Sequence, residues 1–242
     1  MPVLEVSRIS MAFGGVHVLS EVSLSVTAGG VTGLIGPNGA GKTTLFNVVS
    51  GLLEPRSGQV MIDGHDVTGA GPAARARRGV ARTYQRLELF TSLSVRDNIR
   101  VAGEIRNTWE RRGRIDVATE TDRTIEMVGL GDVAEREVST LPTARARVVE
   151  VARALMIQPK VLLLDEPASG QTEEETAAFG QLLRKLVDER GLAICLVEHD
   201  VNLVMGSCEL IYVLDYGEII ASGPPEQVRR DPTVVNAYLG AP

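Results

Sequence analysis

Residues 36–43 read GPNGAGKT, a run in which glycines precede a lysine and a threonine at a fixed spacing. An apolar segment typical of a strand comes before this run, and a segment typical of a helix follows it. Glycines let backbone N–H groups turn inward and leave room for phosphate oxygens, and the start of the helix adds a positive dipole end. Lys42 is then expected to reach the β- and γ-phosphates of a nucleotide, and the Thr43 hydroxyl to hold Mg²⁺. A glycine-rich turn with an incidental lysine is the alternative, which the flanking strand and helix disfavour.

Two adjacent carboxylates follow a second apolar run, in the sequence VLLLDEP at residues 161–167. A buried strand that ends in Asp165 and Glu166 places both side chains at the carboxyl edge of a sheet, where ligands bind in α/β folds. Asp165 is expected to hold Mg²⁺, usually through water, and Glu166 to polarise an attacking water. Alone, the pattern also suits a cap between a strand and a turn. Beside a phosphate-binding loop it favours the functional interpretation.

Two further polar residues come where predicted strands end. His199 lies in LVEHD, directly after an apolar run, so it belongs at the same sheet edge as Glu166 and could contact the γ-phosphate. A lone histidine is more often a structural residue, and His17 and His65 have no comparable setting. Gln85 ends the predicted strand VARTYQ, where a neutral amide can touch the metal or the attacking water.

The elements around these residues predict an α/β domain. Residues 1–35 carry β-branched strands separated by Gly-Gly turns. Residues 161–164 and 192–197 are continuously apolar, which is typical of strands buried on both faces of a parallel sheet. A short helix is predicted to begin at Thr43, directly after the glycine-rich run.

Charged residues and helical spacing replace the β-branched runs in the middle of the chain. We therefore expect a single domain in which a helical lobe, residues 86–157, is inserted into a core lobe made of residues 1–85 and 158–242. The core lobe contains a long predicted helix, which begins with a capping box formed by Thr172 and Glu175.

The composition limits the classes of function. The chain of 242 residues has 25 basic and 31 acidic residues, and its formal net charge of −6 makes it a poor general binder of nucleic acid or anionic lipid. No apolar run approaches the length of a membrane span, and the opening MPVLE lacks the pattern of a secretory signal. Cys195 and Cys208 are predicted to be reduced core thiols of a cytosolic protein.

The motifs and their order resemble the ATPase subunits of ABC transporters, over essentially the whole chain. The resemblance is carried by GPNGAGKTTL, ARTYQ, VARAL, LLLDEP and LVEHD. A closer resemblance, to the ATPase subunits of branched-chain amino-acid importers, is carried by FGGVHVL, GPNGAGKTTLFN, GVARTYQRLELF, EHDVNLVMGSCE and the tail VLDYGEIIASGPPEQVRRDPTVVNAYLG. It implies a P-loop NTPase fold of the ABC ATPase type. This is an α/β fold with a RecA-like parallel-sheet core, an antiparallel β subdomain and an inserted α-helical subdomain.

The resemblance also implies roles for single residues, with ATP and Mg²⁺ as the cofactors. The residues that match catalytic positions are Glu166, His199, Gln85 and Lys42, and those that match the metal site are Thr43, Gln85 and Asp165. The nucleotide-binding positions are Phe13, Gly36, Pro37, Asn38, Gly39, Ala40, Gly41, Lys42, Thr43 and Thr44. Phe13 matches the aromatic residue that stacks on adenine, with a core aromatic as the alternative. The stretch from Gln85 to about Glu104 would face a permease, whereas the cluster Arg75, Arg77 and Arg78 indicates a solvated helix face.

Two segments depart from the family pattern. Leu141, Pro142, Thr143, Ala144 and Arg145 stand where the family has its signature loop, so Ala144 replaces a glycine and Arg145 a glutamine. Gly170, Gln171 and Thr172 stand where the family usually has Gly-Leu-Asn or a Leu-Asp pair. The resemblance implies that both segments contribute to the nucleotide site of the neighbouring subunit. The residues that would bind this chain's own ATP, by contrast, match the family pattern. This asymmetry favours the hypothesis of a heterodimer of two different ATPase subunits, with a homodimer as the alternative.

The function predicted from these residues is ATP hydrolysis that powers membrane transport. Its partners would be integral-membrane permease subunits and a second ATPase subunit, without nucleic acid. The chain would lie on the cytoplasmic face of the plasma membrane, which it contacts only through the permease. Branched-chain amino acids follow from the resemblance, and urea, amides, other amino acids or hydrophobic acids remain open as the solute.

Three other functions fit the sequence less well. A non-transport ABC ATPase of DNA repair or translation tends to have tandem domains or long coiled-coil insertions, which are absent here. A regulatory subunit with little turnover is favoured by the altered signature but disfavoured by Glu166 and His199. A kinase is disfavoured because these two residues, together with Gln85, suit a water nucleophile better than an acceptor substrate.

Overall fold

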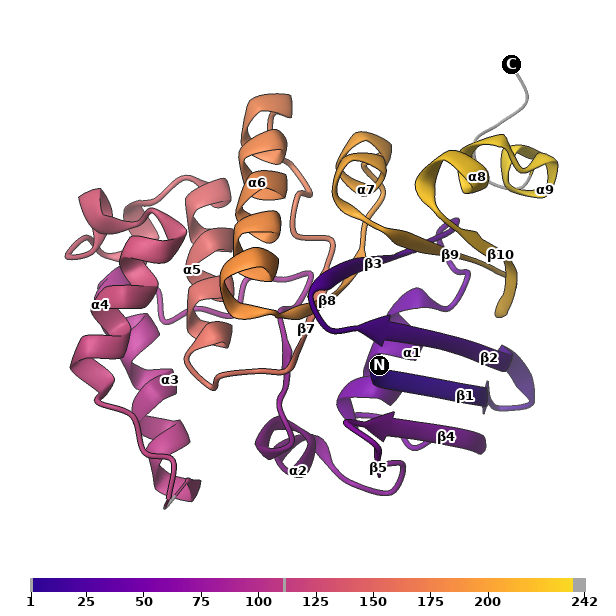
Figure 1. Cartoon of the computed structure of the whole chain (residues 1–242), viewed down its shortest axis with the longest axis horizontal. Helices are drawn as coiled ribbons and strands as arrows, with labels where there is room; N and C mark the ends of the chain where they lie inside the picture. The colour runs from indigo at the N-terminus through magenta and orange to yellow at the C-terminus, as the bar shows by residue number, and fades with distance from the viewer. Residues whose placement is uncertain (1, 111, 237–242) are drawn as a thin grey trace.

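The computed structural model describes residues 2–110 and 112–236. The described chain begins with three strands separated by glycine turns (Figure 1). These strands are β1 (Pro2–Phe13), β2 (Val16–Thr27) and β3 (Gly30–Ile35). Gly14, Gly15 and Gly29 have positive φ angles, which a residue with a side chain rarely adopts, so the turns form at these positions. The strands and turns predicted for this part of the sequence are confirmed.

The strands form two sheets. A four-stranded antiparallel sheet has the order β2-β1-β4-β5, and a six-stranded sheet has the order β10-β9-β3-β8-β7-β6. Within the larger sheet β9, β3, β8, β7 and β6 are parallel, and only β10 pairs in the antiparallel direction. The remaining strands are β4 (Ser57–Ile62), β5 (His65–Asp66), β6 (Val80–Arg82), β7 (Val161–Asp165), β8 (Ala193–Val197), β9 (Leu210–Asp215) and β10 (Glu218–Gly223).

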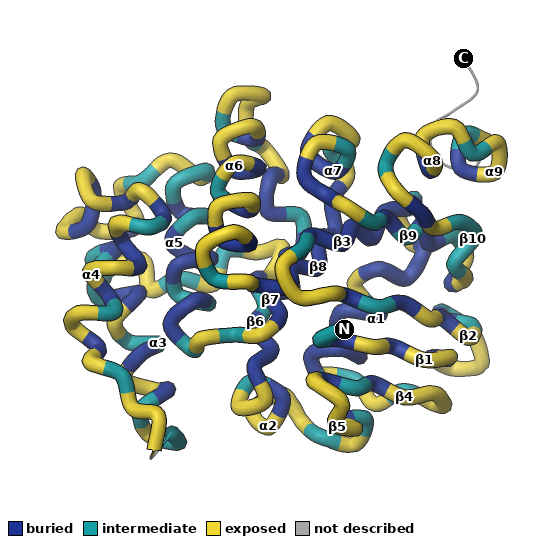
Figure 2. The backbone as a smooth tube through the Cα atoms, in the orientation of Figure 1, coloured by how far each residue is buried: buried dark blue, intermediate teal, exposed yellow. Residues whose placement is uncertain are grey.

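Every residue of β7 and β8 is buried, as the continuous apolar runs predicted (Figure 2). Side chains alternate between the two faces of a strand, so the six-stranded sheet supports two separate cores. Val161 and Leu163 pack into the core that contains β1, β2, β4 and helix α1 (Lys42–Ser50). Leu162 and Leu164 pack into the core on the opposite face, which most of the other helices cover.

The helices of the middle part of the chain lie together beside one end of the large sheet (Figure 1). They are α3 (Val95–Trp109), α4 (Val117–Val128) and α5 (Thr143–Leu155), with the short 3-10 turns η1 (Gly131–Val133) and η2 (Val138–Thr140) between α4 and α5. The others are α2 (Pro72–Arg77), α6 (Glu173–Arg190), α7 (Val201–Ser207), α8 (Pro225–Arg230) and α9 (Pro232–Val234). The last residues of the tail that carries the resemblance, 237–240, lie outside the described residues.

The start of α6 shows the predicted capping box. The Thr172 hydroxyl accepts from the backbone N–H of Glu175, and the Glu175 carboxylate accepts from the backbone N–H of Thr172. Two N–H groups that would otherwise lack partners are satisfied in this way, so the helix begins where the sequence indicated.

The strand predicted over residues 80–85 is shorter in the structure. β6 ends at Arg82, although the next backbone N–H, that of Thr83, still donates to the carbonyl of Leu163 in β7. Beyond this bond the chain leaves the sheet, so Gln85 lies in a loop and not at the end of a strand. The prediction of a strand up to Gln85 was wrong because the chain turns away from β7 after Thr83, although β7 itself continues to Asp165.

The prediction of a solvated arginine face was wrong for Arg75. Arg77 and Arg78 are exposed, but Arg75 is only 1% exposed. Its guanidinium donates to four backbone carbonyls at the end of α1 and in the loop before α2: those of Val48, Val49, Thr68 and Ala70. The last carbonyls of a helix lack intrahelical partners, so Arg75 closes the C-terminal end of α1.

The two cysteines are free and buried, as predicted. Burial raises the pKa of the Cys195 thiol to about 12, because the charged thiolate is disfavoured away from water. Within residues 2–110 and 112–236, no helix combines the length and the apolar character that crossing a membrane requires.

Candidate functional site

The glycine-rich loop connects β3 to α1 and folds around its own lysine. Lys42 is 6% exposed, and its ammonium group donates to the carbonyl oxygens of Gly36, at 2.7 Å, and Pro37, at 2.9 Å. Burial lowers the pKa of Lys42, while the nearby carboxylates of Glu166 and Asp165 raise it. The lysine therefore lies across the loop, next to the two acidic residues that follow β7.

Two glycines of the loop are required by neighbouring backbone. Gly36 has a φ of 150°, and a Cβ added there would lie 1.9 Å from the carbonyl oxygen of Leu214 in β9. Gly41 has a φ of 110°, and its Cβ would lie 2.9 Å from the carbonyl oxygen of Val18 in β2. A side chain at either position would displace a strand, so the loop is held closely between β9 and β2.

The structure brings three of the predicted catalytic residues together around one carboxylate. Glu166 follows β7 directly, and its backbone N–H donates to the carbonyl of Val197 at the end of β8. One carboxylate oxygen of Glu166 lies 2.8 Å from Nε2 of His199, and the other accepts from the amide of Gln85, also at 2.8 Å. Glu166 has a positive φ of 50°, an uncommon conformation for a residue with a side chain. The carboxylate is thus held between groups from two different loops.

Asp165, the last residue of β7, is buried and paired with an arginine. Its Oδ2 accepts from Arg82 of the neighbouring strand β6 at 2.9 Å, and the two side chains are 3% and 5% exposed. Burial raises the pKa of Asp165, and the hydrogen bond and charge of Arg82 act in the opposite direction. Asp165 is therefore a carboxylate whose orientation is set by a buried ion pair.

Two residues of the site were not identified from the sequence. Arg82 is the charged residue within the strand VAR, and its position in an otherwise apolar strand was the available signal. Glu198 is 3% exposed, and its carboxylate accepts from the backbone N–H groups of Ala168, His199 and Asp200. It therefore joins the loop after β7 to the loop after β8, and burial raises its pKa.

The remaining predicted nucleotide-binding residues vary in exposure. Thr43 in the first turn of α1 is exposed and Thr44 is half-buried, while Asn38 and Gly39 at the tip of the loop are exposed. Phe13 stands apart from the loop in sequence as the last residue of β1, and it is 46% exposed. The alternative of a core aromatic is therefore wrong for Phe13, since its ring belongs to neither apolar core.

The donors near the loop suit a magnesium ion that shares its coordination with phosphate. Mg²⁺ is commonly bound by one or two carboxylates together with phosphate oxygens and water, and not by a complete protein cage. Asp165 offers one carboxylate and Thr43 one hydroxyl, and no described part of the chain gathers three or more His, Cys, Asp or Glu side chains into a metal site. This donor set fits a Mg²⁺ ion that is coordinated partly by the protein and partly by the phosphates of a bound nucleotide.

The altered signature segment lies at the start of α5. Thr143 is the first residue of this helix, and Ala144 follows within its first turn. The Arg145 guanidinium donates to the carbonyl of Gly129 at 2.9 Å and forms an ion pair with Asp132 at 2.6 Å. Arg145 is therefore directed toward the segment that follows α4 in the same chain.

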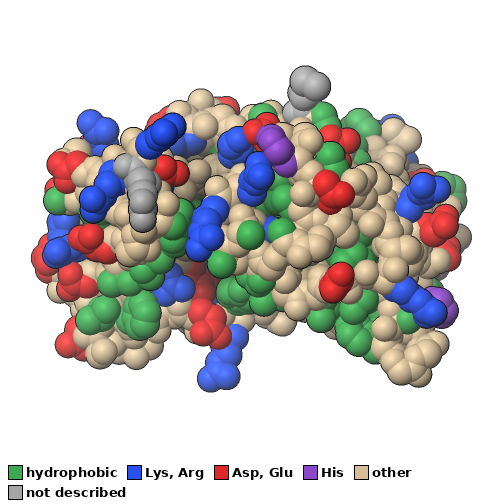
Figure 3. Space-filling view, turned by 90° about the horizontal axis from the view of Figure 1, so that it is seen from below, with side chains coloured by type: hydrophobic (Ala, Val, Ile, Leu, Met, Phe, Trp, Pro, Cys, Tyr) green, Lys and Arg blue, Asp and Glu red, His purple; other side chains and the backbone are tan. Residues whose placement is uncertain are grey.

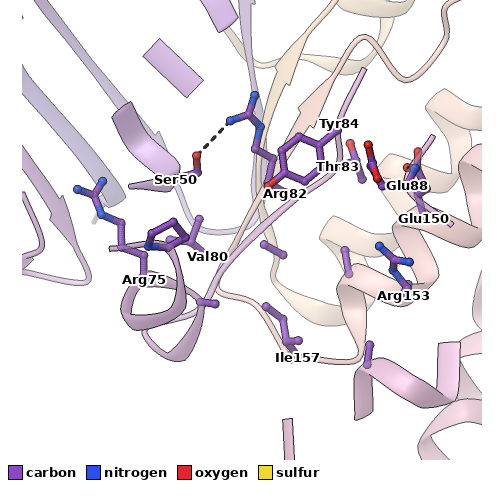
Figure 4. A pocket seen from close by; sticks show the side chains of 15 residues that line it. Ser50, Arg75, Val80, Arg82, Thr83, Tyr84, Glu88, Glu150, Arg153 and Ile157 are labelled. Carbon is purple, nitrogen blue, oxygen red and sulfur yellow. Dashed lines mark hydrogen bonds between the residues drawn. The ribbon is translucent and has the colours of Figure 1, made fainter. Parts of the chain in front are cut away.

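A groove opens on the lower face of the molecule, between β6, α2 and α5. Its cavity has a volume of about 250 Å³. Figure 3 shows this face, on which Lys and Arg side chains gather around a hollow. The lining includes Tyr84, Glu88 and Arg153 (Figure 4). The buried hydroxyl of Thr83 also lines the groove and has no hydrogen-bond partner among the described residues.

Helix α5 connects the groove to the loop of Gln85, which contacts the Glu166 carboxylate. Arg147 of this helix donates to the backbone carbonyls of Tyr84 and Gln85 and pairs with Glu150 at 2.9 Å. The loop that carries Gln85 is thus attached to the helix whose first turn is the signature segment.

Comparison with known proteins shows similarity along the whole chain. A family model described as "ABC transporter" matches residues 19–169, and one described as "Branched-chain amino acid ATP-binding cassette transporter" matches residues 218–242. The chain is 38% identical to the high-affinity branched-chain amino acid transport ATP-binding protein BraF of Pseudomonas aeruginosa, over 99% of this chain and 98% of BraF. It is 35% identical to the lipopolysaccharide export system ATP-binding protein LptB of Haemophilus influenzae, over 99% of this chain and 98% of LptB. Among solved structures, the ADP conformation of MJ1267, an ATP-binding cassette of an ABC transporter, has a TM-score of 0.88 and 30% identity, over 100% of both chains.

A glycine-rich phosphate loop on a parallel sheet, with carboxylates at the same sheet edge, defines a nucleotide-binding α/β ATPase. The family model covers more than half of the chain, and the relatives match over nearly all of it. The chain belongs to the ABC transporter family, in which it is an ATP-binding and ATP-hydrolysing subunit. The predicted family and fold class are confirmed.

The two glycine environments of the loop give a prediction for stability. Gly36→Ala is expected to lower the free energy of unfolding by about 3 kcal/mol or more, because the new Cβ meets the Leu214 carbonyl at an unfavourable φ. Gly39→Ala is the matched control, since Gly39 has a φ of 84° but nothing within 4 Å of its Cβ. Its cost is expected to be about 1–2 kcal/mol, from the backbone alone. Denaturant unfolding measures both variants, and equal losses would contradict the close approach of β9.

Proposed function

We propose that the loop, Asp165, Glu166, Gln85 and His199 form an ATP hydrolysis site that powers uptake of branched-chain amino acids. The observation that carries the catalytic part is the Glu166 carboxylate, held between His199 and Gln85 beside the phosphate loop. A carboxylate with both oxygens oriented by neighbouring groups, at the edge where nucleotides bind in α/β folds, suits the activation of one water molecule.

The nucleotide would lie with its phosphates on residues 36–44. Binding requires Lys42 to exchange the carbonyl oxygens of Gly36 and Pro37 for phosphate oxygens, which is favourable because an ammonium group pairs more strongly with an anion than with a neutral carbonyl. Phe13 would stack on the adenine, in agreement with its exposed ring. Mg²⁺, when bound, supplies positive charge next to the β- and γ-phosphates, and Thr43, Asp165 and Gln85 would hold it.

Glu166 then acts on the attacking water. Each carboxylate oxygen has two acceptor positions, so the bonds to Gln85 and His199 leave room for a water to donate to Glu166. Positioning the water in line with the γ-phosphate and stabilising the charge that develops there are the main contributions to such a reaction. When the γ-phosphate is bound, Nε2 of His199 would contact it in place of Glu166, and the hydrogen bond from Gln85 would continue to orient the Glu166 carboxylate.

The solute is assigned from the C-terminal segment. Identity over the full chain does not separate uptake from export, since BraF and LptB are 38% and 35% identical to this chain. Residues 218–242, by contrast, match the model of the branched-chain amino acid transporters. This second similarity favours an importer of branched-chain amino acids.

The partners would be permease subunits and a second ATPase subunit. A cytoplasmic segment of the permease would occupy the groove lined by Tyr84, Glu88 and Arg153. The Thr83 hydroxyl, which has no hydrogen-bond partner among the described residues, could bond to this segment. The chain would then lie peripherally on the inner face of the plasma membrane, in contact with lipid only through the permease. The second ATPase subunit would be a different chain, because Arg145 is already paired with Asp132 and Ala144 occupies a position where the family has glycine.

The role of Glu166 predicts a separation of binding from turnover. Glu166→Gln is expected to lower steady-state phosphate release by about 100-fold or more, since an amide cannot act as a base, while ATP affinity is retained. The measurement uses the ATPase co-purified with its membrane subunits. Glu174→Gln, an exposed position on α6, is the matched control and should hydrolyse ATP at the wild-type rate. Wild-type phosphate release by Glu166→Gln would exclude Glu166 as the base.

The altered signature predicts slow hydrolysis by the chain on its own. Ala144→Gly combined with Arg145→Gln is expected to raise turnover by about 10-fold or more, because glycine permits close approach of the backbone N–H groups to a γ-phosphate across the dimer. Phosphate release is compared in the assembly that contains the partner subunit. An unchanged rate in that assembly would contradict the heterodimer proposal.

The proposed solute predicts a specific loss of uptake. Cells that lack this chain should take up labelled leucine more slowly, and the wild-type gene should restore uptake whereas Glu166→Gln should not. Mass spectrometry of the membrane proteins that co-purify with the chain identifies the permease. Normal leucine uptake in the deletion strain, with loss of another solute, would overturn the assignment to branched-chain amino acids.

A further inference from the structure

Arg82 occupies a buried position between the groove and the nucleotide site. Its guanidinium lies 5.6 Å from the centre of the Phe46 ring and 4.9 Å from that of Tyr84. Its side chain is only 5% exposed. Arginine stacks on aromatic faces through its planar charged group, so the two rings restrict how the guanidinium can turn.

The same guanidinium joins α1 to the end of β7. One terminal nitrogen donates to Asn47 at 2.7 Å and to Ser50 at 3.1 Å, and the other donates to Asp165 at 2.9 Å. Figure 4 shows the bond between Arg82 and Ser50 beside the ring of Tyr84. Asn47 and Ser50 belong to the last turns of the helix whose first turn contains Thr43.

This arrangement differs from that of a purely structural arginine. Arg75 is also buried against the end of α1, but all its hydrogen bonds go to backbone carbonyls, and it makes no bond to Asp165. Arg82 donates only to side chains, and its Nε has no partner among the described residues. A buried ion pair contributes little net stability against an apolar replacement, so the geometry that Arg82 imposes is the more informative property.

We propose that Arg82 is a positioning residue that orients the Asp165 carboxylate and sets its separation from Thr43, so that both can reach one metal ion bound with the nucleotide. The inference rests on the nucleotide site proposed above. Arg82 leaves Oδ1 of Asp165 without a donor among the described residues, so this oxygen can face the ion. Groups that hydrogen-bond to metal ligands typically change metal affinity by about 10–100-fold when they are replaced.

The test separates metal-dependent from metal-independent binding of a nucleotide. The full-length chain is titrated with a non-hydrolysable ATP analogue by calorimetry, once with Mg²⁺ and once with EDTA, and the ratio of the two affinities is compared. Arg82→Lys keeps the positive charge but cannot hold α1 and Asp165 at once, because an ammonium group lacks the planar fork. We expect it to lower the ratio by about 10-fold while the affinity in EDTA changes little.

Two further variants keep the inference falsifiable. Arg75→Lys is the control for a merely structural loss at the same end of α1, and it should lower the melting temperature without changing the ratio. Asn47→Ala leaves the ion pair with Asp165 but removes one bond to α1, and it should lower the ratio by a smaller factor than Arg82→Lys. If Arg82→Lys does not fold, Asn47→Ala decides the matter.

The outcomes distinguish this inference from the proposed nucleotide site. An unchanged ratio in Arg82→Lys or Asn47→Ala, an equal loss in Arg75→Lys, or equal losses of affinity with and without Mg²⁺ would each overturn the role of Arg82. So would a wild-type chain whose affinity does not depend on Mg²⁺. Absence of nucleotide binding by the wild type under both conditions would instead overturn the nucleotide site itself.

Discussion

The parallel register of the central strands is the constraint on which the site depends. Asp165 pairs with Val197, and Leu34 pairs with the same residue from the other side, so β3, β7 and β8 end at one level. The chain leaves each strand through a loop that carries polar groups: the phosphate loop after β3, Glu166 after β7 and His199 after β8. Parallel strands all present their carboxyl ends to the same edge of the sheet. Residues that are far apart in the sequence therefore meet at this edge.

Charge at this edge is balanced by a small number of specific contacts. The Asp165 carboxylate is buried and compensated by Arg82, whereas Glu166 is held by neutral Gln85 and by His199. Lys42 lies beside both carboxylates but bonds to carbonyl oxygens of its own loop. Removing a charged group from water costs more than an ion pair usually returns, so these groups are better explained by the site than by stability. Glu198 is likewise a buried carboxylate, and it connects the loops after β7 and β8 by accepting hydrogen bonds from their backbone N–H groups.

Two groups of segments in this chain differ in how well they match the family: those that would bind its own nucleotide, and those that would contribute to the site of a neighbouring subunit. The phosphate loop, Asp165 and Glu166 match the motifs of the family, and the structure places Lys42 of this loop beside both carboxylates. The signature segment carries a Cβ at Ala144, and Arg145 is engaged by Asp132 and the Gly129 carbonyl within the same chain. Arg147, two residues further along α5, is attached to the loop of Gln85. The helix that begins with the altered signature is therefore hydrogen-bonded to the loop that borders both Glu166 and the groove.

Much of this protein follows from its sequence alone. Glycine spacing, apolar runs and the capping box are local signals, and they were enough to predict the phosphate loop, the strands β7 and β8, and helix α6. The family was predicted separately, from the resemblance of the motifs and their order. The meeting of Gln85 and His199 at Glu166 was expected only as a shared sheet edge; the contacts themselves depend on how the strands are ordered and where each loop turns. The sequence misjudged Arg75 and passed over Arg82 and Glu198, because a charged residue looks like a surface residue until its partners are known. Those partners are carbonyls and side chains from distant segments, so only the tertiary structure could decide that these charges are buried.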